Sequence, residues 1–104
     1  MNSGFHLAPA GWSKCDYGST IGESDCEDVV RSFAATFKQV PKRSMQIGSG
    51  GTCRDNSWGE VPLGCSAQSG GDWTAHYKTS TDNGAGCIHL NYQLVCLSTG
   101  KYFS

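Results

Sequence analysis

Residues 24–37 read SDCEDVVRSFAATF, and their apolar side chains repeat with the period of an α-helix. The residues on that face are Cys26, Val29, Val30, Phe33, Ala34 and Phe37. Ser24 and Glu27 have the spacing of a capping box, in which each side chain bonds a backbone N–H at the helix start. Pro41 lies just beyond and cannot continue a helix. The stretch predicts one amphipathic helix, in the N-terminal half of the chain, with a buried apolar face.

On the C-terminal side of this helix the chain has the alternating pattern of β-strands. Residues 73–98 contain two such runs, joined by the reverse-turn dipeptide Asn83-Gly84. This pattern predicts an antiparallel hairpin that turns His76 and His89 away from the core. The expected fold class is α+β, with one helix packed on a small antiparallel β-sheet.

The chain has 104 residues and six cysteines, so we expect a single domain over 1–104 whose small core is supplemented by disulfides. The cysteines are Cys15, Cys26, Cys53, Cys65, Cys87 and Cys96. None of them has the short spacing, about two to four intervening residues, that is typical of zinc-ligand pairs. The even count predicts three disulfides of open connectivity, with no metal and no cofactor. Disulfides form in oxidising compartments, so a secreted, extracellular protein is expected.

The charges of the chain nearly cancel, because eight Lys and Arg stand against nine Asp and Glu. Proteins that bind duplex nucleic acid carry a basic surface, so duplex nucleic acid is not an expected partner. No apolar run approaches the ~20 residues of a membrane helix, and no membrane span is expected. The opening residues, MNSGFHLAPAGW, lack the charged and apolar regions of a signal peptide, and we expect a mature secreted chain that acts as a monomer.

The segment between Cys53 and Cys65 is aperiodic and glycine-containing, yet it carries Trp58. A loop restrained by disulfides loses little conformational entropy on binding, and an aromatic ring on it suits stacking on a sugar or insertion into a protein pocket. The alternative is that Trp58 covers an open end of the sheet, whereas Trp73 belongs to a strand pattern and is expected in the core. The expected ligand-binding residues are Trp58, Asn56, Arg54 and Asp72.

These features favour a small secreted binding protein, such as an effector, toxin, inhibitor or lectin, that recognises an extracellular glycan or protein through residues 54–72. The alternative function is a small secreted hydrolase of ribonuclease type. In that hypothesis His76, His89 and Glu60 perform acid–base catalysis, and Arg54 holds the phosphate. A serine hydrolase is disfavoured, because the chain has no Gly-x-Ser-x-Gly motif.

Two resemblances bear on these alternatives. A helix followed by antiparallel strands, together with GEVPL at 59–63 and NYQL at 91–94, is similar to the layout of secreted guanyl-specific microbial ribonucleases. That family carries its catalytic glutamate, arginine and histidine in this order, whereas here Arg54 precedes Glu60 and no arginine follows. CEDVVRSF and GSGGTC resemble segments of fungal secreted effectors related to killer toxins. The chain is assigned to neither family.

Overall fold

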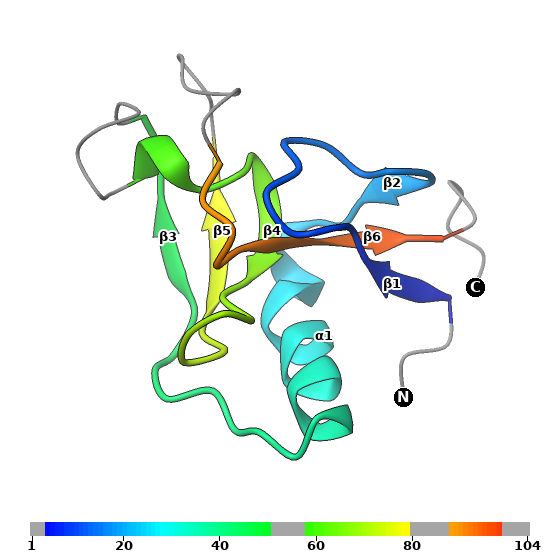
Figure 1. Cartoon of the computed structure of the whole chain (residues 1–104), viewed down its shortest axis with the longest axis vertical. Helices are drawn as coiled ribbons and strands as arrows, with labels where there is room; N and C mark the ends of the chain where they lie inside the picture. The colour runs from blue at the N-terminus through cyan, green and yellow to red at the C-terminus, as the bar shows by residue number, and fades with distance from the viewer. Residues whose placement is uncertain (1–3, 51–57, 80–87, 99–104) are drawn as a thin grey trace.

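The computed structural model describes residues 4–50, 58–79 and 88–98, and in it one α-helix packs against a six-stranded sheet (Figure 1). The helix, α1, spans Glu23–Thr36. The strands are β1 (Phe5–Leu7), β2 (Ser19–Thr20), β3 (Gln46–Gly48), β4 (Gly64–Ala67), β5 (Ala75–Lys78) and β6 (Gln93–Leu97). A short 3₁₀ helix, η1, spans Trp58–Glu60.

The sheet is mixed and larger than the small antiparallel sheet that the sequence predicted. Its strand order is β1-β6-β4-β5-β3, with β2 also paired to β6. The neighbouring strands are antiparallel except for β3 and β5, which run parallel. The α+β class is therefore confirmed, and the purely antiparallel arrangement is wrong.

The hairpin predicted over residues 73–98 does not form. Strands β5 and β6 both exist, but β4 lies between them and pairs with each, so that Ala67 is opposite Ala75 on one side and Gln93 on the other. All four residues of β4 are buried. A strand covered on both faces has no polar–apolar alternation, which is why the pattern did not reveal it.

Helix α1 begins one residue earlier than predicted, and the capping box is wrong. Gly22 is the N-cap residue and makes no side-chain capping bond. The Glu27 carboxylate instead accepts a hydrogen bond from the Met45 N–H at 2.9 Å. Glu27 therefore joins the helix to the chain just before β3.

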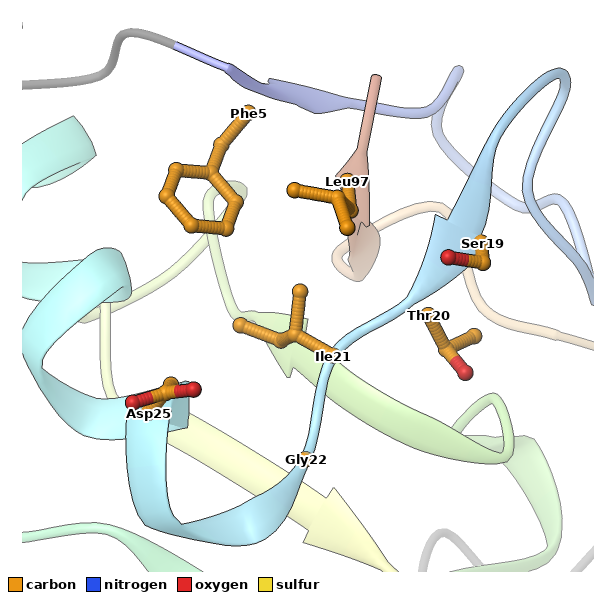
Figure 2. Close-up of a pocket in the computed structure, with 7 residues that line it drawn as sticks. All are labelled: Phe5, Ser19, Thr20, Ile21, Gly22, Asp25 and Leu97. Atoms are coloured by element: carbon orange, nitrogen blue, oxygen red, sulfur yellow. The ribbon is translucent and has the colours of Figure 1, made fainter. Parts of the chain in front are cut away.

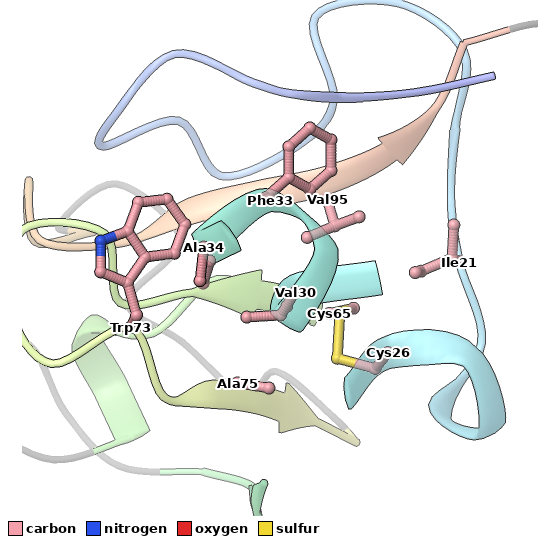
Figure 3. Packing of buried hydrophobic residues seen from close by; sticks show 10 residues of the cluster. Ile21, Cys26, Val30, Phe33, Ala34, Cys65, Trp73, Ala75 and Val95 are labelled. Atoms are coloured by element: carbon pink, nitrogen blue, oxygen red, sulfur yellow. A yellow bond between two sulfur atoms is a disulfide. The ribbon is translucent and has the colours of Figure 1, made fainter. Parts of the chain in front are cut away.

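The hydrophobic core lies between α1 and the sheet, as the helical period predicted. The helix contributes Cys26, Val30, Phe33 and Ala34, and all four are buried. Figure 3 shows these side chains gathered against β4, β5 and β6, with the Trp73 indole near Ala34. Trp73 is buried as expected, whereas Phe37 is 57% exposed and stacks on it from outside.

Two disulfides, rather than the three predicted, are seen in the described residues. Cys26–Cys65 joins α1 to β4, and Cys15–Cys96 joins the β1–β2 loop to β6. Cys53 and Cys87 lie outside the described residues. Two disulfides indicate an extracellular or otherwise oxidising environment. Within the described residues, no helix is long and apolar enough to span a membrane.

Candidate functional site

A polar concavity of about 260 Å³ lies on the face of the sheet opposite α1, and we name it the Trp58 pocket. Residues before and within β3, on η1, after β4, on β5 and before β6 contribute to it. The lining residues are Arg43, Gln46, Trp58, Val61, Gln68, His76 and Tyr92. Side chains alternate across a strand, and Ala75 packs toward α1, so His76 points to the opposite face.

Trp58 is half-buried, and its indole lies against Gly48 of β3. A Cβ at position 48 would fall 2.1 Å from the indole Cε2, so glycine is what admits the ring. The Lys78 Nζ is buried behind η1 and donates to the carbonyl oxygens of Trp58 and Val61, at 2.7 and 3.2 Å. The indole is thus held from two sides. The indole covers part of the sheet and also lines the pocket, and its contact with a ligand stays a prediction.

His76 is only 6% exposed, which corrects the prediction that it faces solvent. Rings of Trp58 and Tyr92 stand edge-on to the imidazole, with centroids 5.5 and 5.1 Å away, and cover that face of β5. His76 Nδ1 lies 3.1 Å from the Thr74 carbonyl oxygen, which can only accept, so we assign the proton to Nδ1. Burial lowers the pKa of His76 despite that hydrogen bond. The ring is therefore neutral at pH 7, and its Nε2 is an acceptor.

Arg43 is held at the pocket by two hydrogen bonds. Its Nε donates to Asp72 Oδ2 at 3.0 Å, and its guanidinium also donates to Gln68 Oε1 at 3.3 Å. Asp72 accepts a further bond from the Thr74 N–H. Partial burial acts to raise the pKa of Asp72, but the bonds from Thr74 and Arg43 outweigh it and lower the pKa. Asp72, predicted to contact a ligand, orients Arg43 through this bond, and its contact with a ligand stays a prediction.

Of the other residues chosen from the sequence, the described ones, Glu60 and His89, do not line this pocket. Arg54 and Asn56 lie outside the described residues. The His89 N–H donates to the Glu60 carbonyl oxygen at 3.0 Å, so these two are neighbours along the backbone, but neither lines the pocket. His89 is exposed and lies before β6, not opposite His76 on a hairpin. Among the described members of the predicted hydrolase constellation, His76 lines the pocket, and Glu60 and His89 do not.

Sequence reasoning missed five lining residues, namely Arg43, Gln46, Val61, Gln68 and Tyr92. Gln46, Gln68 and Arg43 come from segments that have no motif to mark them as a binding site. Tyr92 fits the apolar alternation of the second run in 73–98, a pattern that does not distinguish a pocket residue from a core residue. It precedes β6, and burial raises its pKa. The pairing of β5 with β3 and β4, and of β4 with β6, brings these segments to one place.

A second concavity, of about 250 Å³, lies between β1, β2, β6 and the start of α1. Figure 2 shows Phe5, Ile21 and Leu97 converging on it, with Asp25 at its helical side. Ile21 belongs to the core, and the other two apolar side chains pack against that core. We assign this concavity to imperfect packing between helix and sheet.

The Trp58 pocket combines two aromatic rings with groups that donate and accept hydrogen bonds in fixed directions. Gln46 and Gln68 offer amides, Arg43 a guanidinium, and His76 a neutral acceptor. Among the described lining residues only His76 is a common metal ligand, so the pocket suits a polar organic ring better than a metal ion. Comparison with known proteins finds no matching family model, no matching relative and no matching solved structure.

Proposed function

We propose that the protein is a secreted, disulfide-stabilised binding protein of the effector, toxin, inhibitor or lectin kind, and that it recognises an extracellular glycan through the Trp58 pocket. The observation that carries the proposal is the half-buried Trp58 indole, fixed against β3 beside oriented amide and guanidinium groups. A sugar presents a C–H face to an aromatic ring and hydroxyls to hydrogen-bonding groups around it, which is the arrangement that this pocket offers.

The polar groups are oriented before any ligand arrives. Asp72 and Gln68 hold Arg43, and Lys78 holds the turn that carries Trp58. Preorganised groups lose little entropy on binding, which supports a recognition role. The volume of about 260 Å³ is just below the range of about 300–1,000 Å³ common for small-molecule sites. It favours the end of a glycan over a long chain.

The third disulfide belongs to the same proposal. With Cys15, Cys26, Cys65 and Cys96 already bonded in two pairs, Cys53 and Cys87 are the remaining cysteines, and we propose that they bond to each other. That bond would restrain the segment preceding Trp58, and it supports an extracellular destination.

The test is a glycan array probed with oxidised protein, followed by calorimetry with the best ligand. Trp58→Ala should weaken binding by about 30-fold or more, the effect of losing a central aromatic anchor. Trp12→Ala is the matched control, because Trp12 is exposed and outside the pocket, and it should bind as the wild type does. Unchanged affinity in Trp58→Ala, or no glycan bound at all, would overturn the proposal.

One observation favours the ribonuclease-type hydrolase as a second candidate. His76 is neutral with an accepting Nε2, and Arg43 lines the same concavity, so a base and a phosphate anchor are together. The assay is cleavage of single-stranded RNA by the purified protein. This candidate requires His76→Gln to lower the rate at least about 100-fold while His89→Gln leaves it unchanged. Absence of RNA cleavage by the wild type removes the candidate.

A further inference from the structure

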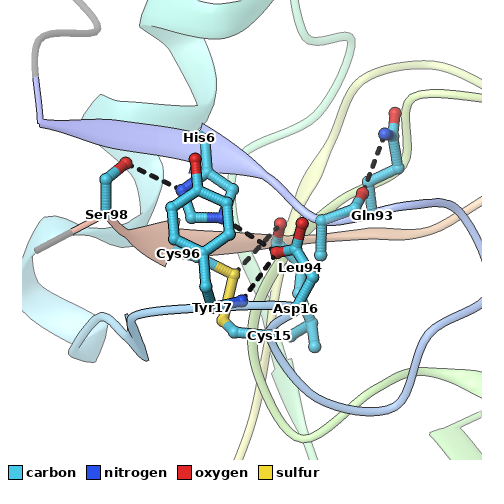
Figure 4. Close-up of a disulfide and its surroundings, with 9 residues drawn as sticks. His6, Cys15, Asp16, Tyr17, Gln93, Leu94, Cys96 and Ser98 are labelled. Carbon is cyan, nitrogen blue, oxygen red and sulfur yellow. Dashed lines mark hydrogen bonds and ion pairs between the residues drawn. A yellow bond between two sulfur atoms is a disulfide. The ribbon is translucent and has the colours of Figure 1, made fainter. Parts of the chain in front are cut away.

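The Cys15–Cys96 disulfide lies on the sheet face opposite α1, where it packs against Ala8 and Leu94 and has the polar side chains of His6, Asp16 and Ser98 beside it (Figure 4). His6 of β1 lies directly across the pairing register from Cys96 of β6. His6 Nε2 is 2.9 Å from Asp16 Oδ1. The potential ligand atoms of His6, Asp16 and Cys96 all lie within 4.8 Å of one another.

We propose that reduction of the Cys15–Cys96 disulfide turns this cluster into a Zn²⁺ site, with Cys15, Cys96, His6 and Asp16 as the four ligands. Two thiolates, an imidazole and a carboxylate are donors that zinc takes in a tetrahedral arrangement. Bonds of about 2.0–2.3 Å at tetrahedral angles place neighbouring ligand atoms about 3.3–3.8 Å apart. Three of the ligand atoms, those of His6, Asp16 and Cys96, already lie within 4.8 Å of one another. The fourth, Cys15 Sγ, is bonded to Cys96 Sγ at 2.04 Å and must move away from it once the bond opens. The site is separate from the Trp58 pocket and does not depend on the proposed function.

The fold holds the ligands together after the disulfide opens. Strands β1 and β2 both pair with β6, so the loop that carries Cys15 and Asp16 is anchored to β6 at both ends. That loop also approaches β6 closely at Gly18, where a Cβ would overlap the Leu97 carbonyl oxygen. The reduced Cys15 therefore stays beside Cys96, and the fold keeps the ligands close together before zinc binds.

The surroundings of His6 orient it as a metal ligand. Its Nδ1 lies 2.8 Å from Ser98 Oγ, and its ring stacks on Tyr17 with centroids 3.9 Å apart. Ligating histidines usually bond a polar group through the ring nitrogen that does not face the metal. Here Ser98 holds Nδ1 and leaves Nε2 directed at Asp16. The position of the ring suits coordination through Nε2. Because the Asp16 carboxylate can only accept, Nε2 carries the proton in the present structure, and zinc binding requires that proton to move to Nδ1, where Ser98 Oγ can accept it.

The conversion balances with a dithiol as the reductant. Two electrons and two protons pass from the dithiol to the disulfide, which leaves Cys15 and Cys96 as thiols and the dithiol as a disulfide. Zn²⁺ then displaces both thiol protons. Cys15 is half-buried, whereas its partner Cys96, like Cys26 and Cys65, is 0% exposed, so a dithiol would attack the first bond from the Cys15 side. Mild reduction should open the first bond and spare the second.

The test uses the full chain, reduced with dithiothreitol, freed of reductant under argon and titrated with Zn²⁺ and with Co²⁺. The reduced wild type should bind with the charge-transfer and d–d bands of tetrahedral Co²⁺ thiolate, and the oxidised protein should show neither. His6→Gln keeps all six cysteines and should weaken Zn²⁺ binding at least about 100-fold, since loss of even an outer-sphere partner costs 10–100-fold. Equal Zn²⁺ affinity in the variant and the wild type would overturn the proposal.

A second measurement needs no variant. Reduced wild type is alkylated with iodoacetamide, with and without Zn²⁺, and the modified cysteines are located by mass spectrometry. The proposal requires Zn²⁺ to slow alkylation of Cys15 and Cys96 at least tenfold. If both cysteines react at the same rate with and without the metal, they are not ligands.

Discussion

Replacing Gly48 with alanine should displace the Trp58 indole from β3 without removing the ring. The new Cβ would fall 2.1, 2.3 and 2.6 Å from the indole Cε2, Nε1 and Cδ2 atoms. Carbon atoms in favourable contact are about 3.5–4.0 Å apart, so the ring must retreat by about 1.5 Å. Overpacking of this kind costs about 1–3 kcal/mol of unfolding free energy.

The loss of unfolding free energy corresponds to a fall in melting temperature that depends on the length of the chain. An unfolding entropy of about 2.1 cal/mol/K per residue, over 104 residues, gives a shift of about 5 °C for each kcal/mol. Gly48→Ala should therefore melt about 5–14 °C below the wild type. It should also weaken glycan binding, because the displaced indole no longer lines the pocket in its original position.

A double-mutant cycle isolates the contact. In a Trp58→Ala background the ring is gone, so Gly48→Ala should be neutral or stabilising by about 0.4–1 kcal/mol, the usual gain from restricting the unfolded chain. The coupling between the two positions should then reach at least 1 kcal/mol. If Gly48→Ala costs the same in both backgrounds, the indole does not rest on Gly48, and the description of the pocket is wrong.

Three further predictions concern stability. Phe33→Ala should cost about 3–5 kcal/mol in urea denaturation, because the ring is buried between α1 and the sheet, and a loss below about 1 kcal/mol would contradict that placement. Replacing Cys26 and Cys65 with alanine opens a loop of sequence separation 39 and should cost about 4 kcal/mol, and an unchanged denaturation midpoint would refute it. Because burial lowers the pKa of His76, the unfolded chain takes up a proton near pH 6.5 before the folded protein does, so stability should fall as the pH drops below about 6.5. His76→Gln should show a shallower fall, and parallel curves for variant and wild type would exclude this cause.

The helix could be predicted because its signal is local. Its apolar residues recur every three or four positions, and Phe33 and Cys26 are buried where that period places them. Strand pairing is not local. The buried strand β4, GCSA, has no alternation, so nothing in the sequence showed that it separates β5 from β6.

The candidate site was predicted only in part, for the same reason. Trp58 stood out as a large ring in an aperiodic segment, and it does line the pocket. His76 was chosen for its chemistry, but the prediction that it is exposed was wrong. The rings of Trp58 and Tyr92 that cover it come from segments distant in sequence. The cluster around His6 was missed because a search for closely spaced ligand pairs ignores residues that a sheet brings together.

Strands β1 and β2 both pair with β6, so neither can join the sheet until β6 is in place. Their pairing partners all lie in one strand near the end of the described chain, and the Cys15–Cys96 bond spans a sequence separation of 81. Contacts of such long range form slowly, because the chain loses the entropy of loop closure before the contacts stabilise it. During synthesis Cys15 therefore emerges long before Cys96, its partner. A chain that ends before Gln93 lacks β6, so β1 and β2 lose their pairing partner. A deletion at the C-terminal side therefore removes the N-terminal strands from the sheet.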